Sequence, residues 1–154
     1  MTAPDPESLT PLMHAASCGH VEVVQCLLDA SSPVDALNSD GETALMIAAD
    51  EGQVEVVRTL IRARADMHAN IEGETALHIA CSSGKPDVVR LLLEARADKD
   101  AVYGEDGLTP LHCATLEGHV AVMQCLIDAG SNNEVTTHDG ETPLMLAAEQ
   151  GELD

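Results

Sequence analysis

The sequence predicts an all-α solenoid, in which short helix-turn-helix units stack on one another and β-hairpin fingers connect them. Similar segments begin at threonines that are spaced 32 to 34 residues apart along the 154-residue chain. The composition agrees, because the chain has no Trp, no Phe and a single Tyr, which favours thin layers of small side chains over one large aromatic core. The repeat threonines are Thr10, Thr43, Thr75, Thr109 and Thr142.

The first helix of each repeat is expected to begin after the threonine, which is a candidate N-cap followed by Pro or Ala, and to end at a glycine such as Gly19. A second helix follows almost at once. In "HVEVVQCLLDA", Val21, Val24 and Leu28 share one face at helical spacing, so this face is expected to be buried. The Asp-Gly and Glu-Gly pairs between repeats predict the tight turns of the fingers, at Asp40-Gly41, Glu72-Gly73, Asp106-Gly107 and Asp139-Gly140.

The repeated motif reads "LTPLMHAASCGH" at residue 9, "ETALHIACSSGK" at 74 and "LTPLHCATLEGH" at 108. With its period near 33 residues, the pattern T-[PA]-L-[HM]-x-A resembles the ankyrin repeat over residues 5 to 154. We expect an N-terminal tail at 1–8 and an ankyrin repeat domain at 9–154. Its repeats are predicted at about 9–39, 40–71, 72–105 and 106–138, with a truncated fifth repeat at 139–154.

His112 and Cys113 are adjacent, and Cys with His is the pair that thiol hydrolases and zinc sites use. The other repeats argue against both interpretations, because methionine fills the His112 position at Met13, Met46 and Met145. The resemblance implies that this histidine forms hydrogen bonds in the turn region and braces neighbouring repeats. His20 and His119 are interpreted as incidental surface or capping residues. We therefore predict no catalytic residue, no cofactor and no metal site.

The five cysteines are odd in number, show no C-x-x-C spacing and lie within apolar helical patterns. They are interpreted as reduced thiols in an intracellular protein of the cytoplasm or nucleus. The N-terminal segment "MTAPDPESL" lacks the basic and apolar regions of a signal peptide, and no apolar run is long enough to cross a membrane. We expect neither secretion nor membrane insertion.

The net charge of −20 is unevenly distributed. All seven basic residues lie between 58 and 99, where six acidic residues leave a balance of +1, whereas residues 1–57 carry −10 and residues 100–154 carry −11. Such a field repels phosphate backbones, so nucleic acid is not expected as a direct ligand. We also expect Arg62 to lie between Asp29 and Glu94 in a ladder of ion pairs on the convex surface, an interpretation that we prefer to a second binding patch there.

The resemblance implies that a protein partner binds the concave side, which finger tips and first helices form. The corresponding positions make a mostly acidic face with two apolar places, and the finger tips add apolar side chains that are expected to have no packing role. This face is expected to bind a basic segment with apolar anchors, and no small-molecule substrate. The alternative is that the array is the regulatory or substrate-recruiting part of a larger enzyme or channel. The candidate partner-binding residues are Leu37, Glu42, Asp50, Glu51, Ile71, Glu74, Val102, Tyr103, Leu108, Leu116, Glu117 and Glu141.

Overall fold

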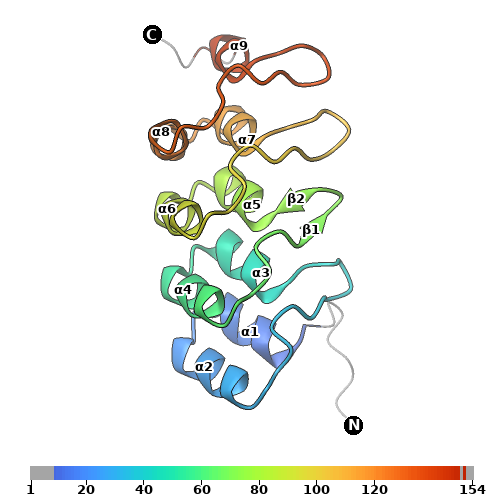
Figure 1. Cartoon of the computed structure of the whole chain (residues 1–154), viewed down its shortest axis with the longest axis vertical. Coiled ribbons are helices and arrows are strands. Elements are labelled where there is room, and N and C mark those ends of the chain that lie inside the picture. The colour runs from blue at the N-terminus through green and yellow to red at the C-terminus, as the bar shows by residue number, and fades with distance from the viewer. Residues whose placement is uncertain (1–8, 150, 152–154) are drawn as a thin grey trace.

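The helices form two columns in the computed structural model, which describes residues 9–149 and residue 151 (Figure 1). One column contains the first helix of each repeat, and the other contains the second helices; the predicted all-α solenoid is confirmed. The first helices are α1 (Pro11–Ser17), α3 (Ala44–Glu51), α5 (Ala76–Ser82), α7 (Pro110–Leu116) and α9 (Pro143–Glu149). The second helices are α2 (Val21–Asp29), α4 (Val54–Arg62), α6 (Pro86–Glu94) and α8 (Val120–Asp128). The predicted tail at 1–8 and the last residues of the fifth repeat, 150 and 152–154, lie outside the described residues.

Threonine caps begin the first helices, as the sequence predicts. The hydroxyl oxygen of Thr10 accepts a hydrogen bond from the backbone N–H of Met13 at 3.2 Å, and Thr43 accepts one from Met46 at 3.3 Å. These bonds satisfy donors that have no partner within the helix. The helix α3 ends at Gly52, whose φ of 75° is left-handed and therefore suits glycine. The next helix can then start two residues later.

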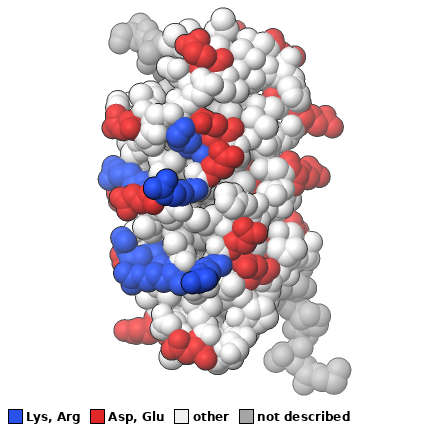
Figure 2. Space-filling view, viewed as in Figure 1, with Lys and Arg blue, Asp and Glu red and all other residues white. Residues whose placement is uncertain are grey.

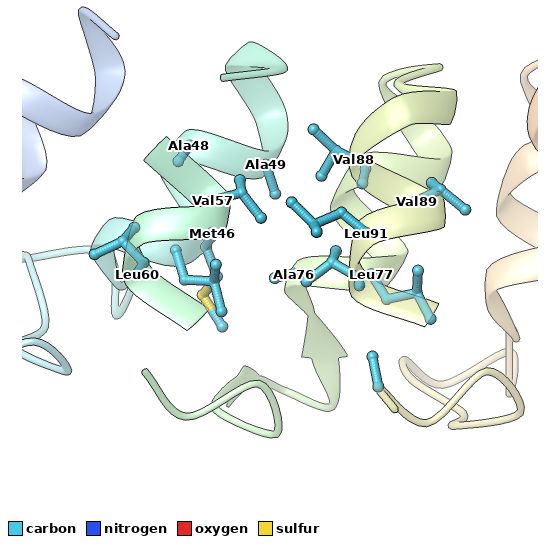
Figure 3. Packing of buried hydrophobic residues seen from close by; sticks show 14 of the residues in the cluster. Met46, Ala48, Ala49, Val57, Leu60, Ala76, Leu77, Val88, Val89 and Leu91 are labelled. Carbon is cyan, nitrogen blue, oxygen red and sulfur yellow. The ribbon is translucent and has the colours of Figure 1, made fainter. Parts of the chain in front are cut away.

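Small side chains bring the first helices close together. Ala48 of α3 and Ala80 of α5 are 0% exposed, and they lie within one apolar cluster that runs from repeat one to repeat four. Figure 3 shows Val57 and Leu60 of α4 in the same layer as Leu77 of α5. Helices that approach this closely need small residues at the contact, so the alanine pairs of the motif explain the narrow stack.

The fingers are less regular than predicted. Within the described residues, one finger has paired strands, β1 (Asn70–Ile71) and β2 (Glu74–Thr75), and the next has a single bridge between Tyr103 and Leu108. The first finger is held instead by Asn38, whose Oδ1 accepts from the backbone N–H groups of Asp40 and Glu42. A side-chain acceptor can replace a strand ladder in so short a turn.

The predicted ladder of ion pairs is wrong. Arg62 forms no ion pair with Asp29 or Glu94 in the part of the chain that the structure describes. Arg58 instead approaches Glu55 of its own helix at 3.5 Å, and Arg90 approaches Asp87 at 3.1 Å. Residues three apart on a helix are already neighbours, so such a pair forms without reaching across to another repeat.

Candidate functional site

Three carboxylates of the predicted face come together between repeats two and three. Burial raises the pKa of Glu74, and the nearby charges of Asp50 and Glu42 raise it further, while a hydrogen bond from Tyr103 lowers it. Asp50 and Glu42 of repeat two therefore disfavour the charged form of Glu74 across the repeat boundary. A cation bound among them would relieve this repulsion, so the cluster is suited to a lysine or arginine side chain.

Neighbouring polar groups orient two of these carboxylates. Asn38, which is buried in the first finger, donates from Nδ2 to Oε2 of Glu42 at 2.8 Å. The hydroxyl of Ser83, from the following repeat, donates to Asp50. Because the side chains are already held, less conformational entropy is lost when a partner binds them.

Leu108, Leu116 and Glu141 come together in a second place, between repeats four and five. They line a pocket of about 200 Å³, together with Leu146, Asp106 and Asp139. An apolar floor with carboxylates around it suits an aliphatic side chain that carries a positive charge. Asp106 and Asp139 were predicted only as turn residues and not as part of the binding face. Their place in the Asp-Gly pairs, one per repeat, is the signal that could have identified them.

The predicted finger tips divide into two kinds. Leu37 and Val102 are 61% and 57% exposed, as expected of residues available to a partner. Ile71 and Tyr103 were expected to have no packing role, and this is wrong, because both are half-buried against the core cluster. Tyr103 lies over Gly73 of the preceding finger, where an added Cβ would come within 3.1 Å of it. The fingers thus pack on one another, which the sequence of a single finger does not reveal.

Glu51 and Glu117 lie at the ends of α3 and α7, and both are exposed. No described residue forms a hydrogen bond or ion pair that fixes either carboxylate, so their part in binding stays a prediction. The candidate face therefore has two organised places, the carboxylate cluster and the apolar pocket, with freely exposed acids beside them.

His112 and Cys113 are structural residues. The Nδ1 atom of His112 lies 3.2 Å from the backbone nitrogen of Thr109, and Nε2 lies 3.3 Å from the carbonyl oxygen of Glu141 in the next finger. Both ring nitrogens are therefore engaged, and neither is available to take a proton from the thiol. Burial raises the pKa of Cys113 to about 11, so the thiol is protonated at neutral pH and is a poor nucleophile. His78 braces the third and fourth repeats in the same way, since its Nε2 lies 3.0 Å from the carbonyl oxygen of Ala101.

The interpretation of His119 as incidental is wrong. Its Nε2 lies 2.9 Å from the carbonyl oxygen of Ser82, and Gln53 donates from Nε2 to the carbonyl oxygen of Ser17 at 3.0 Å. Both side chains cross a repeat boundary to the end of the preceding first helix. His119 and Gln53 differ in chemical type, but both side chains are long enough to reach the preceding repeat. A long polar residue follows the helix-ending glycine in every repeat, and this pattern could have identified the hydrogen bond between repeats.

Among the described residues, no group of three or more His, Cys, Asp or Glu side chains is arranged to hold a metal ion. In the same part of the chain, no helix has the length and apolar character needed to cross a membrane.

Comparison with known proteins gives repeat-family matches over most of the chain. Residues 1–71 match a family model described as "Ankyrin repeats (3 copies)", and residues 77–127 match one described as "Ankyrin repeats (many copies)". The chain is 42% identical over 45 residues to E3 ubiquitin-protein ligase XBAT32 of Arabidopsis thaliana, an alignment covering 29% of this chain and 9% of that protein. It is 38% identical over 42 residues to ankyrin repeat-containing protein P1E11.10 of Schizosaccharomyces pombe, covering 27% of this chain and 20% of that protein.

Proposed function

The chain belongs to the ankyrin repeat family, whose arrays are protein-protein interaction modules, and on this premise we propose that it binds a basic segment of a partner protein through its acidic concave face. The observation that carries the proposal is the carboxylate cluster, in which Asn38 holds Glu42 at 2.8 Å, Ser83 holds Asp50, and burial with the charges of Asp50 and Glu42 raises the pKa of Glu74. Carboxylates held in mutual repulsion gain most from a bound cation. The partner supplies that cation, and the array has no catalytic role.

The apolar residues set the affinity of this complex. The pocket that contains Leu108 and Leu116 takes an apolar anchor of the segment, and the exposed finger-tip residues Leu37 and Val102 contact it at the rim. Buried apolar contacts hold a complex, whereas complementary charge mainly speeds encounter and fixes register. Free buried thiols at Cys81 and Cys113 suit the reducing cytoplasm or nucleus, which we infer as the site of action.

Charge reversal tests this proposal. We expect the triple variant Glu42→Lys, Glu74→Lys and Glu141→Lys to slow association with a synthetic Lys/Leu peptide and to flatten its dependence on salt, because exposed charges act through a screened field. Stopped-flow fluorescence at several salt concentrations measures both quantities. The matched control carries the same charge change on second helices, at the exposed residues Glu22, Glu94 and Asp128.

If the control slows association as much as the triple variant, only the overall charge matters and the concave face is not the binding site. We also expect reversal of Arg58 and Arg90, on the second helices, to change association little. A larger effect from this pair than from the triple variant would place recognition on the opposite side of the stack.

A second candidate follows from the length of the relatives. The alignments span 9% and 20% of the two proteins, one of which is a ubiquitin ligase, so an array of this kind can be one part of a larger protein. In that case the acidic face recruits a substrate or regulates an enzyme or channel domain outside this sequence. Sequencing the full-length transcript distinguishes the two candidates, because the second requires a further domain in the same reading frame.

A further inference from the structure

A second surface of the molecule concentrates its positive charge. Figure 2 shows Lys and Arg gathered at the level of α4 and α6, with some Asp and Glu beside and between them and others above and below. We call this surface the basic belt. It consists of Arg58, Arg62, Arg64, Arg90, Arg96 and Lys99, from the second helices of repeats two and three and the turns that follow.

Three of the six basic-belt residues form no ion pair with another described residue. Arg58, Arg90 and Lys99 each pair with a carboxylate of their own segment, at 3.5, 3.1 and 2.8 Å. Arg62, Arg64 and Arg96 are exposed, and none of them forms an ion pair within residues 9–149. In a protein of net charge −20, three guanidinium groups on one face have thus been left available.

Two of these arginines occupy positions that glycine would fill at lower cost. Arg64 and Arg96 have φ values of 63° and 69°, in the left-handed region, where repeat four has Gly130 at 74°. A side chain in this conformation is strained, and glycine is not. Folding therefore does not explain why arginine is present at these two turns.

Shallow pockets with a mixed polar and apolar lining lie beside two of the free arginines. Arg62 borders a pocket of about 390 Å³ that is also lined by Leu28 and Val34 and by the polar side chains of Gln25, Asp29 and Thr59. Arg96 borders another of about 320 Å³, which is lined by Leu93 and Ala97 and also by Asp98, Lys99 and Asp100. Arg62 and Arg96 are thus each next to a shallow pocket with some apolar surface, which an aliphatic side chain can contact.

We propose that the basic belt is a second docking surface, for a short acidic segment of a protein that carries aliphatic residues. The segment's carboxylates pair with Arg62, Arg64 and Arg96, and its aliphatic side chains enter the two pockets. A planar guanidinium binds a carboxylate through two hydrogen bonds, which gives this pairing its geometry.

The negative charge at both ends of the stack favours a short protein segment as the ligand of the basic belt over RNA or an anionic membrane. The belt spans repeats two and three, whereas residues 1–57 and 100–154 carry −10 and −11. A polyanion or a lipid surface extends past the belt and meets these flanks, where it is repelled. A segment confined to two repeats meets only the residues near 58–99, whose balance is +1, since charges are screened beyond about 8 Å at physiological salt.

A glycine variant tests the belt without damaging the fold. We expect Arg64→Gly with Arg96→Gly to weaken binding of a fluorescent Glu/Leu peptide at least about tenfold in fluorescence anisotropy, as loss of desolvated charge pairs does. The melting temperature should stay equal or rise, because the strained turns become relaxed. The control Asn133→Glu with Thr136→Glu makes the same change in net charge at exposed positions off the belt, and it should retain binding.

Three results overturn the proposal. Wild-type protein that fails to bind the Glu/Leu peptide at low salt has no such docking surface. Equal losses in the glycine variant and the control mean that only overall charge matters. Tighter binding of duplex RNA or phosphatidylserine vesicles than of the peptide, lost in the glycine variant, makes the partner a phosphate-bearing one instead.

Discussion

Repeats four and five contain the same motif, yet they bury it differently. Leu111 and His112 in α7 are 2% and 0% exposed, whereas their counterparts Leu144 and Met145 in α9 are 66% and 54% exposed. The difference lies in the neighbours, since α7 packs against both α8 and α9, and no described residue covers the corresponding side of α9. Burial in this fold is therefore a property of the stack, and a single repeat cannot produce it.

The largest expected effect is a difference in stability loss between matching leucine variants in repeats four and five. We expect Leu111→Ala to lower the free energy of unfolding by about 2–5 kcal/mol, because it leaves a cavity among fully packed side chains. Leu144→Ala should cost less than about 1 kcal/mol, because most of that side chain is already in water. Urea titration followed by circular dichroism measures both. Similar losses in the two variants would show that α9 is covered in solution and would contradict the comparison.

Buried imidazoles provide the next contrast, since repeats three and four have histidine where repeats one, two and five have methionine. Burial lowers the pKa of His78 and His112, so the unfolded chain binds protons that the folded chain excludes. Their contribution to stability is therefore complete above the unfolded pKa of about 6.5 and is lost as the pH falls below it. His78→Met with His112→Met should flatten this loss and change stability at neutral pH by no more than about 1.5 kcal/mol per site, the range for near-isosteric replacements.

The pKa of Glu74 is shifted in the opposite direction, so a variant of this residue serves as the control for the pH dependence of stability. Burial raises its pKa, so the folded protein holds this proton more tightly than the unfolded chain, and stability is gained as the pH falls. Glu74→Gln removes that gain, and the variant should lose more stability on acidification than the wild type does. Urea titrations between neutral and mildly acidic pH measure all three proteins. An unchanged pH profile in the histidine variant would show that other groups cause the acid sensitivity.

The sequence predicts the repeats well because each helix carries its own signals. Threonine caps, helix-ending glycines and helical apolar spacing are local, and the structure has them where the motif places them. The alanine pairs similarly predict close first helices. What a residue does inside its own repeat can therefore be predicted from the repeat.

Contacts between repeats were predicted less well. The packing of Ile71 and Tyr103, the reach of His119 to Ser82 and the absence of the Arg62 ladder all depend on distances across a repeat boundary. Sequence spacing gives the order of the repeats but not these distances. The candidate site is affected most, because its carboxylate cluster and its apolar pocket both lie at such boundaries.

The smallest expected effect concerns the turn after the second helix, where repeat four again differs from the others. Gly130 has a φ of 74° and no atom within 4 Å of an added Cβ, so Gly130→Ser meets backbone strain and no steric clash. We expect it to cost about 1 kcal/mol, the penalty for a non-glycine residue in the left-handed region. Ser31 has a φ of 63° at the same position in repeat one, so Ser31→Gly should stabilise the protein by a similar amount. Differential scanning calorimetry compares the melting temperatures of the two single variants and of the double variant that carries both substitutions. The double variant should melt close to the wild type. If Ser31→Gly destabilised the array, the serine would be making a contact that outweighs its backbone strain. Stabilising contacts of this kind would then also have to be considered for Arg64 and Arg96.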